Sequence, residues 1–524
     1  MSAKIQKFSF DFRDQYFDFD GLQFAFRVCT MENVYGPDPE KTRITSQERG
    51  IRVEAKWLQF AGGQRKCPGH LIANLWKDGG ELRLKVEAEH QEIIKGITIL
   101  IRGLAAPVDE ERIESWPRHV LVGSEPPFGQ IKTVEGGTAA MMPTTTKFRF
   151  RRWAVYHEYS GYWVFNMSED EECTKRCQKM DGSEWVIVRN PILGAMSNRW
   201  YKLIERERGL KPWKERADVP SWLRQVSLVL NMHCEGWTGY VFNTFNRQLE
   251  ILRWIAERIE GKHVLVYLAG WDGRYYWNYP VYEPSKACGG AEGLKRLMDG
   301  AHQLGIHVIP MFSLIASNYK KTKKLGFQQA TCRTAYDYEE ICDWTEWDED
   351  LSTDPIWQSL NVGEARFREY LLNRIYWVTD TFDTDGVVLD ISGWMPRDPQ
   401  HNFLDGLKIL IENLHARYRE FLIFGEHGCE LHMSLIPIFH SMAHLEADHP
   451  FYRYCRTAYH LSIGAPGRGS TGVHELGVNP YQRPCADKPA IPTLGIVGDT
   501  LSQHANEIEA VIRITKDWAK RWNA

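Results

Sequence analysis

Two carboxylates are the residues whose types and spacing best suggest chemistry. Asp390 ends the apolar run VVL, and Glu426 ends the apolar segment FLIFG. They lie 426 − 390 = 36 residues apart, which is the length of one strand–helix unit, so we expect them on neighbouring strands facing one cleft. In such a pair one carboxylate can attack a carbon atom while the other donates and accepts a proton.

The spacing also predicts a reaction type. Two carboxyl groups about 5–5.5 Å apart are the arrangement that cleaves glycosidic bonds with retention of configuration. In that scheme Asp390 is the ionised nucleophile and Glu426 the protonated acid/base. The small Gly425 beside Glu426 is expected to leave space for a ligand. The predicted partner is a small carbohydrate, and no cofactor or metal is predicted.

Other strand ends carry polar and aromatic side chains that we expect to bind substrate. Indoles can stack on a sugar face, a carboxylate can accept from two hydroxyls, and imidazoles can donate hydrogen bonds. The candidates are Trp271, Asp272, His233, Trp394 and His427. The loop 464–472 has four glycines and Arg468, and is expected either to cover the cleft or to bind an anionic substituent.

The elements that must position these residues follow a strand–helix rhythm after residue 215. Eight alternations over about 300 residues predict a C-terminal (β/α)8 TIM-type barrel, whose active site lies at the carboxyl ends of its strands. A doubly wound sheet is the alternative, but no GxGxxG or GxxxxGK[ST] follows any strand. The expected strands are 225–233, 263–271, 307–313, 385–393, 421–428, 442–448, 460–466 and 492–500, with a short helix around 431–441 after the fifth.

The first 215 residues have a different pattern. Short period-2 segments rich in β-branched and aromatic residues alternate with Gly, Pro and Asn turns, and a helix is expected only over 198–216. We therefore predict an N-terminal antiparallel β-sandwich domain over 1–215 and a catalytic barrel over 216–524.

Sandwich and barrel in this order, with DGVVLDISGW and FLIFGEHG ending strands four and five, resemble retaining α-glycosidases. The similar families are the amylase clan and the endo-α-N-acetylgalactosaminidase family. The resemblance implies Asp390 as nucleophile, Glu426 as acid/base, and α-linked oligosaccharides or glycosides as substrates. Val388 replaces the Arg of the amylase pattern, and no Asn-His-Asp follows strand seven, which argues against a starch amylase.

Two alternatives remain open. The α-galactosidase and α-glucosidase-like barrels place their acid on strand six, which here would be Glu446 or Asp448. A metal-dependent barrel hydrolase or isomerase would instead use the carboxylates and imidazoles that follow strand five, but the HxxxxH spacing does not place two His on one helical face. That donor set would be His427, His432, His444, Glu446, Asp448, His449 and Asp499.

Composition limits the partners and the compartment. Lys+Arg 64 against Asp+Glu 68 gives a net charge of −4, so no basic field exists to hold nucleic acid. No apolar stretch approaches the roughly 18–20 residues of a membrane span, and the N-terminal segment does not read as a signal peptide. Eleven cysteines without CxxC spacing fit reduced thiols in a cytoplasmic enzyme. Homo-oligomer formation is left open.

Overall fold

The computed structural model describes residues 5–7, 14–107, 129–158, 160–236, 239–274, 276–334, 336–342, 357–459, 486–496, 501 and 504–523. The chain divides into two compact units, Met1–Gly209 and Leu210–Ala524. Helix α1 (Leu193–Arg208) ends the first unit, where Gly209 adopts φ 69° and caps it. The change of pattern near residue 215 falls just inside the second unit. None of the helices in the described ranges is long and apolar enough to cross a membrane.

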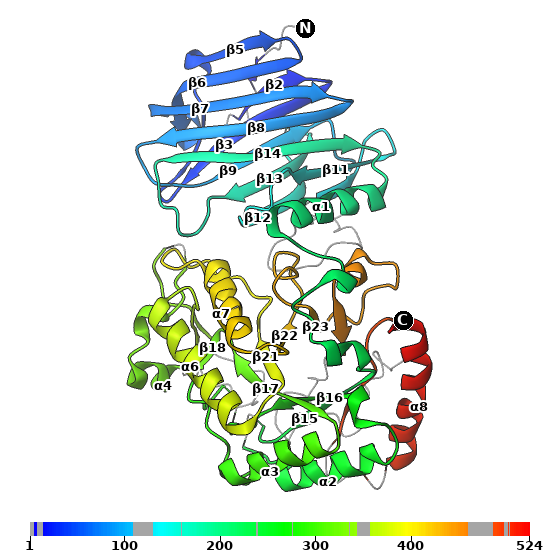
Figure 1. Cartoon of the computed structure of the whole chain (residues 1–524). Helices are drawn as coiled ribbons and strands as arrows, with labels where there is room; N and C mark the ends of the chain where they lie inside the picture. Colours follow the sequence, from blue (N-terminus) through cyan, green and yellow to red (C-terminus); the bar gives the residue numbers. More distant parts are fainter. Residues whose placement is uncertain are drawn as a thin grey trace. The chain divides into compact units, whose positions relative to one another are not determined.

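The first unit is an antiparallel β domain, as predicted in outline (Figure 1). Its strands form one sheet, because β4 pairs with β3 on one side and with β6 on the other, while β1, β2 and β5 branch from the main path. The strands are β1 (Ile5–Lys7), β2 (Gln15–Phe19), β3 (Leu22–Thr30), β4 (Val34–Pro37), β5 (Thr42–Gln47), β6 (Gly50–Phe60), β7 (Arg65–Asp78), β8 (Glu81–His90), β9 (Ile94–Arg102), β10 (Gly129–Lys132), β11 (Thr138–Pro143), β12 (Arg151–His157), β13 (Trp163–Asp170) and β14 (Lys179–Arg189).

Side chains from distant strands of this sheet pack into one hydrophobic core. Strand β8 alternates buried and half-buried residues, as a strand with one face on a core must. Phe24 of β3 and Ile99 of β9 belong to the same buried cluster as Leu71 of β7 and Leu84 of β8. The period-2 pattern of the sequence therefore corresponds to side chains that point into a shared core.

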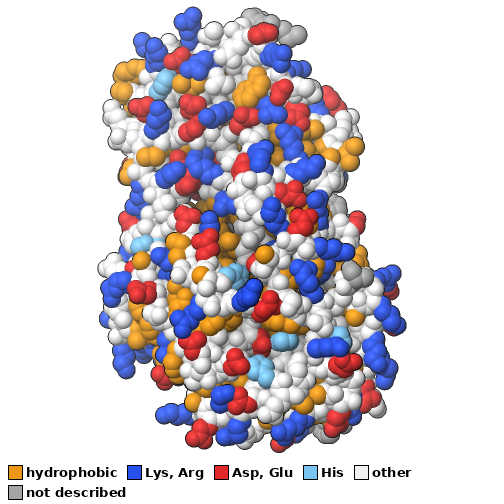
Figure 2. All heavy atoms as spheres, in the orientation of Figure 1, with side chains coloured by type: hydrophobic (Ala, Val, Ile, Leu, Met, Phe, Trp, Pro, Cys, Tyr) orange, Lys and Arg blue, Asp and Glu red, His pale blue; other side chains and the backbone are white. Residues whose placement is uncertain are grey.

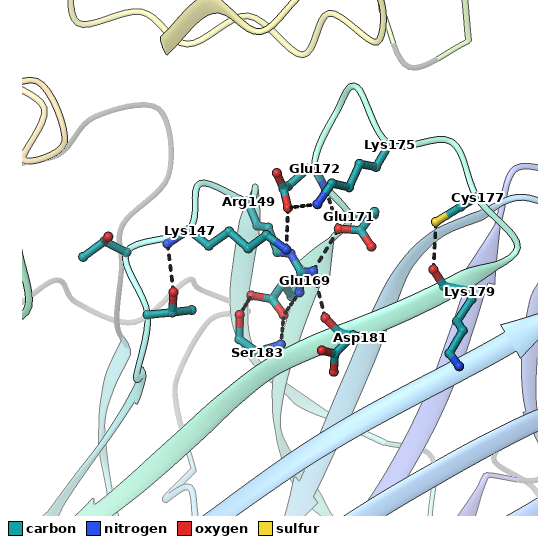
Figure 3. Close-up of polar contacts among 12 residues, drawn as sticks. Lys147, Arg149, Glu169, Glu171, Glu172, Lys175, Cys177, Lys179, Asp181 and Ser183 are labelled. Carbon is teal, nitrogen blue, oxygen red and sulfur yellow. Dashed lines mark hydrogen bonds and ion pairs between the residues drawn. The ribbon is translucent and has the colours of Figure 1, made fainter. Parts of the chain in front are cut away.

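A buried ion network joins Arg149, Glu169 and Ser183 of this domain (Figure 3). The Glu169 carboxylate accepts hydrogen bonds from Arg149 at 3.2 Å, from Arg151 at 3.0 Å, and from the backbone N–H of Ser183 at 2.9 Å. Burial alone would raise the pKa of Glu169, but the two guanidinium groups and Ser183 outweigh it and lower the pKa. The ionised carboxylate is therefore part of the folded structure at neutral pH.

Replacing this carboxylate is expected to destabilise the domain. Glu169→Gln leaves Arg149 and Arg151 buried with less negative charge, and should cost about 3–5 kcal/mol in denaturant unfolding at pH 7. The partly exposed Glu172, which pairs with Lys175 at 2.8 Å, is the matched control, and Glu172→Gln should cost under about 1 kcal/mol. Because the pKa of Glu169 is lowered, its stabilisation is present above the ordinary pKa and is lost as pH falls through the lowered one. Equal losses in the two variants would contradict this account.

The second unit contains a parallel eight-stranded barrel, as predicted in outline (Figure 1). The sheet order runs from β24 to β25, and a parallel bridge between Ala458 and Ile491 closes it. Every residue of β15, β16, β21 and β22 is buried, which explains their apolar sequences. The strands are β15 (Leu228–His233), β16 (Val264–Ala269), β17 (His307–Ser313), β21 (Gly386–Asp390), β22 (Leu422–Glu426), β23 (Ile438–His440), β24 (Arg456–Ala458) and β25 (Thr493–Gly495).

Helices follow five of these strands in the described part of the chain. Thr244 and Asn402 cap the starts of α2 and α7 with their side chains, as expected of these residue types. The helices are α2 (Phe245–Ala256), α3 (Gly290–Gln303), α6 (Ala365–Phe382), α7 (Phe403–Arg417) and α8 (Ala505–Trp522). The insertion between β17 and α6 holds α4 (Tyr319–Leu325) and a small sheet of β18 (Ala316–Asn318), β19 (Ile341–Cys342) and β20 (Trp357–Ser359).

The predicted sixth strand is wrong. The range 442–448 forms turns, and the strand lies earlier at Ile438–His440, where a helix was expected. Pro437 cannot donate a helical hydrogen bond, and only three residues pair, too few for a period-2 signal. The seventh strand is Arg456–Ala458, whereas the predicted 460–466 lies outside the described residues.

Candidate active site

The carboxyl ends of three neighbouring barrel strands carry Asp390, Glu426 and His440. Each is followed by a residue with left-handed backbone: Ile391 at φ 58°, His427 at φ 50° and Ser441 at φ 79°. Such angles are rare for non-glycine residues, above all for a β-branched one, and cluster at functional sites. The chain turns sharply there, directly after each side chain that could do chemistry.

Asp390 and Glu426 lie beside each other. The register pairs Leu389 with Gly425, so the next residues along the two strands are the two carboxylates, and the charge of Glu426 raises the pKa of Asp390. The backbone N–H of Ile391 donates to Glu426 Oε2 at 2.6 Å. Ser392 Oγ accepts from the Glu426 N–H and donates to the Glu426 carbonyl oxygen, both at 2.9 Å. Hydrogen bonds from backbone and side-chain groups thus join the two strand ends.

The protonation of this pair differs from the prediction. Burial, and then the negative charge and hydrogen bond of Glu426, raise the pKa of Asp390 well above its ordinary value, while a hydrogen bond from Tyr276 opposes the rise. The sequence predicts an ionised Asp390 beside a protonated Glu426. In this structure the carboxyl of Asp390 favours its proton, because two carboxylates in contact cannot both ionise.

Gly425 has a different role from the one predicted. A Cβ atom there would lie 2.8 Å from Ser392 Oγ and 2.8 Å from the Phe439 ring. The missing side chain makes room for the Ser392 hydroxyl that fastens Glu426, rather than for a ligand.

Buried polar atoms without partners gather around the carboxylate pair. Within the described ranges, both carboxylate oxygens of Asp272, Oδ2 of Asp390, the Ser313 hydroxyl and the Tyr279 hydroxyl are buried without a hydrogen-bond partner. Burial, and then the charges of Asp272 and Asp390, raise the pKa of Tyr279, while Ser313 pairs in register with Asp390. Buried groups of this kind are usually satisfied, so their concentration at one barrel end indicates a place where a polar ligand binds.

Asp272 is the clearest of these groups. It is 4% exposed, and burial, reinforced by Glu235, raises its pKa to about 8 although Lys321 opposes the rise. Lys321 of α4 donates to Asn278 Oδ1 at 2.7 Å, and burial lowers its own pKa. A carboxyl and an ammonium group near each other at a strand end can together bind sugar hydroxyls.

The other predicted substrate-binding residues differ from one another in burial and in their contacts. Trp394 is half exposed, and the preceding Gly393 N–H donates to the Glu426 carbonyl at 2.9 Å. His427 is exposed, with Nε2 3.6 Å from Glu426 Oε1. His233 ends β15, is buried, and meets Phe242 edge-on at 6.3 Å. These placements leave their predicted roles open.

The position of Trp271 argues against its predicted stacking on a sugar face. It is fully buried, and its indole N–H donates to the Met311 carbonyl oxygen at 2.8 Å. With its ring packed against Phe312, it belongs to the barrel wall and has no face available to a sugar.

The strand-six candidates follow the sixth strand of the barrel, which ends earlier than predicted. His440 is the last residue of β23 and pairs in register with Glu426. Glu446 and Asp448 lie in the turns that follow, and both are exposed. Arg468, the loop 464–472 and Asp499 lie outside the described residues. Among the residues that the structure describes, no three His, Cys, Asp or Glu side chains are grouped to hold a metal ion.

Sequence reasoning missed Tyr276, Tyr279 and Lys321. The aromatic stretch 275–282, directly after the second strand, was a usable signal for the two tyrosines. Lys321 gave no such signal, because a short helix within the insertion brings it to the site.

The comparisons with known proteins show that the fold is similar to that of solved α-glycosidases, as the resemblance implied. An α-N-acetylgalactosaminidase of Bifidobacterium bifidum in its ligand-free form has a TM-score of 0.61 at 12% identity, covering 99% of this chain and 93% of that one. Its complex with GalNAc gives 0.59 at 14% identity, covering 90% and 81%. An α-galactosidase of Geobacillus stearothermophilus gives 0.50 at 12% identity, covering 99% and 85%.

The sequence matches are more limited. No protein-family model matches the chain. A 1,4-α-glucan branching enzyme of Shewanella sp. (strain W3-18-1) is 25% identical over 190 residues, which cover 34% of this chain and 24% of that relative. The chain therefore matches about a quarter of the branching enzyme's length.

Proposed function

We propose that this chain is a retaining glycoside hydrolase acting on α-linked oligosaccharides or glycosides, with Asp390 as nucleophile and Glu426 as acid/base. The observation that carries the proposal is the position of these two buried carboxylates at the ends of adjacent strands, where Glu426 raises the pKa of Asp390. Neighbouring strand ends suit the separation of about 5–5.5 Å that retaining enzymes use better than the roughly 6.5–9.5 Å of inverting ones. The fold that this proposal implies is an N-terminal β-sandwich followed along the chain by a (β/α)8 TIM-type barrel.

The reaction needs one proton on the pair, which is what two carboxyls in contact hold. An oxygen of Asp390 bonds to the anomeric carbon as the glycosidic bond breaks, and the leaving oxygen takes the proton of Glu426. Glu426 then removes a proton from water, the water oxygen bonds to the anomeric carbon, and the bond to Asp390 breaks.

The neighbours named above suggest which sugars to test first. Their names specify α-linked galactose and N-acetylgalactosamine, so we propose α-galactosides and α-N-acetylgalactosaminides as leading candidates. Surface charge supports a small neutral partner over nucleic acid, since basic and acidic side chains are interspersed on the face shown in Figure 2. Cytoplasmic location remains a prediction of the sequence, which leaves the oligomeric state open.

Asp272 should set substrate affinity. Sugar hydroxyls that donate to its two unpartnered oxygens would favour the ionised form, whose pKa is otherwise about 8. Asp272→Asn should lower kcat/KM by about 10²-fold or more, since each hydrogen bond to a charged group contributes about 1.5–3 kcal/mol. The exposed Asp448→Asn is the control and should match the wild type. An unchanged kcat/KM in Asp272→Asn would remove Asp272 from the site.

The function is tested with α- and β-nitrophenyl glycosides, uronides included, assayed with and without chelator. We expect nitrophenol release from one or more α-glycosides, insensitive to chelator, and NMR should show the α-anomer as the first-formed sugar. Release of the β-anomer first would mean an inverting enzyme. Activity that disappears with chelator would favour a metal-dependent hydrolase, and silence across nitrophenyl and natural α-glycosides would contradict the proposal.

A further inference from the structure

Strands β6, β7 and β8 of the first unit lie side by side (Figure 1), and polar side chains from them line a hollow of about 510 Å³. His70 of β7 pairs in register with Glu89 of β8, and its Nε2 lies 3.1 Å from Oε1 of Glu54 of β6. Leu71 and Ala88, their neighbours along the chain, belong to the core, so His70 and Glu89 point to the outer face of the sheet. Small-molecule sites have volumes of about 300–1,000 Å³, so the hollow is large enough for a ligand.

An irregularity in the pairing of β6 with β7 places an indole beside this hollow. The register shifts between Ala55 and Trp57, so that Lys56 and Trp57 are both exposed, while Ala55 and Leu58 lie in the core. Such irregularities turn a side chain to the other face of a strand. Trp57 is 39% exposed and pairs in register with Pro68, which lines the hollow. Because side chains of cross-strand partners are in contact range, the indole lies at the edge of the hollow.

The polar side chains around the hollow are available to a ligand. Lys56, Glu89 and Gln91 line it and are exposed. Among the hydrogen bonds and ion pairs of the described residues, none involves these three side chains. The Lys56 ammonium and the Gln91 amide can donate, while the Glu89 carboxylate and the Gln91 amide can accept. The hollow therefore offers donors and acceptors together on one surface.

The mixture of charges disfavours charged ligands. Glu54 and Glu89 repel an anion, and Lys56 repels a cation. Burial lowers the pKa of His90, although Glu92 opposes this, so the imidazole that also lines the hollow adds no positive charge at neutral pH. In the described part of the chain, no three His, Cys, Asp or Glu side chains are grouped to hold a metal ion. A neutral sugar fits better, because each hydroxyl both donates and accepts, and the C–H face of the ring packs on an indole.

We propose that this hollow is a second carbohydrate-binding site, which takes neutral oligosaccharides and does not cleave them. Trp57 stacks on a sugar face, while Lys56 and Glu89 exchange hydrogen bonds with its hydroxyls. Asp390 and Glu426 belong to the other unit of the chain, so a sugar bound here is held without hydrolysis. The inference goes beyond the proposed function and does not depend on it, since binding needs no turnover.

The test measures binding of the full-length chain to immobilised neutral oligosaccharides that end in α-galactose, α-N-acetylgalactosamine or α-glucose. Asp272→Asn and Asp390→Asn are introduced together, so that the barrel neither binds the sugar tightly nor cleaves it. This chain should still bind at least one oligosaccharide, and adding Trp57→Ala should weaken its affinity about tenfold or more. Failure to bind any of the oligosaccharides, or equal binding with Trp57→Ala, overturns the proposal, as does a preference for uronide-terminated sugars.

A second variant keeps the test decisive if Trp57→Ala disturbs the fold. Glu89→Ala removes an exposed carboxylate, should leave thermal unfolding unchanged, and should weaken binding about tenfold. Glu48→Ala, an exposed carboxylate in the turn between β5 and β6, is the matched control and should bind like its parent. Equal binding by Glu89→Ala and Glu48→Ala would contradict the site. If no glycoside is cleaved by the wild type but binding depends on Trp57 and Glu89, the proposed function fails and this inference stands.

Discussion

Asp390→Asn should abolish turnover, with kcat reduced on the order of 10⁴-fold or more, while the protein stays folded. The amide is similar in size to the carboxylate but cannot form the glycosyl ester. Because the pKa of Asp390 is raised by burial and by Glu426, a neutral side chain suits its site in the folded protein. We therefore expect thermal unfolding at neutral pH to occur at or above the wild-type temperature. The measurements are nitrophenol release and a melting curve on one preparation.

Rescue by azide distinguishes a catalytic nucleophile from a carboxylate that is only structural. With Asp390→Gly, azide can enter from the side that the carboxylate occupied, so an α-glycoside with a good leaving group should yield the β-glycosyl azide. Asp448→Asn, an exposed carboxylate beyond the end of the sixth strand, controls for loss of charge and should retain wild-type turnover. Wild-type turnover in Asp390→Asn, with mass spectrometry excluding deamidation, would eliminate the nucleophile assignment.

The fully buried strands β21 and β22 were predictable from the sequence, and so were the residues that end them. VVLD and LIFGE are apolar runs closed by a carboxylate, so the strand, its parallel environment and the position of the side chain follow from one pattern. Adjacency of Asp390 and Glu426 followed from chain order, since consecutive strands of a barrel are neighbours. Strands β23 and β24 could not be predicted in this way, because a strand of three residues is too short to show a period-2 pattern.

What the sequence could not supply is the environment of each side chain. Trp271 and Trp394 look alike as indoles near strand ends, yet one has its N–H bonded inside the barrel wall and the other is half exposed. The direction of the Asp390 pKa shift depends on which groups touch it, and one of these, Tyr276, comes from a loop over a hundred residues away. Such contacts arise from tertiary packing, which local patterns do not encode.

Glu426→Gln should impair catalysis in a way that depends on the leaving group. The variant cannot protonate the departing oxygen, so hydrolysis of unactivated glycosides should fall about 10²–10⁴-fold. Dinitrophenyl glycosides need little protonation and should still form the glycosyl ester on Asp390, where it accumulates because no base activates water. A burst of dinitrophenol followed by slow turnover is the expected trace, and mass spectrometry should detect the ester.

Azide should then restore turnover in Glu426→Gln and give an α-glycosyl azide. This anion needs no general base, and it attacks the ester from the face that the leaving group has vacated, so two inversions give net retention. The product therefore has the opposite configuration to that from Asp390→Gly, and the two variants together assign both carboxylates. Glu446→Gln and Asp448→Asn are the matched comparisons, since a strand-six acid would transfer the burst and the rescue to one of them. If one of these two variants shows the burst and the rescue while Glu426→Gln is fully active on unactivated glycosides, Glu426 is not the acid/base.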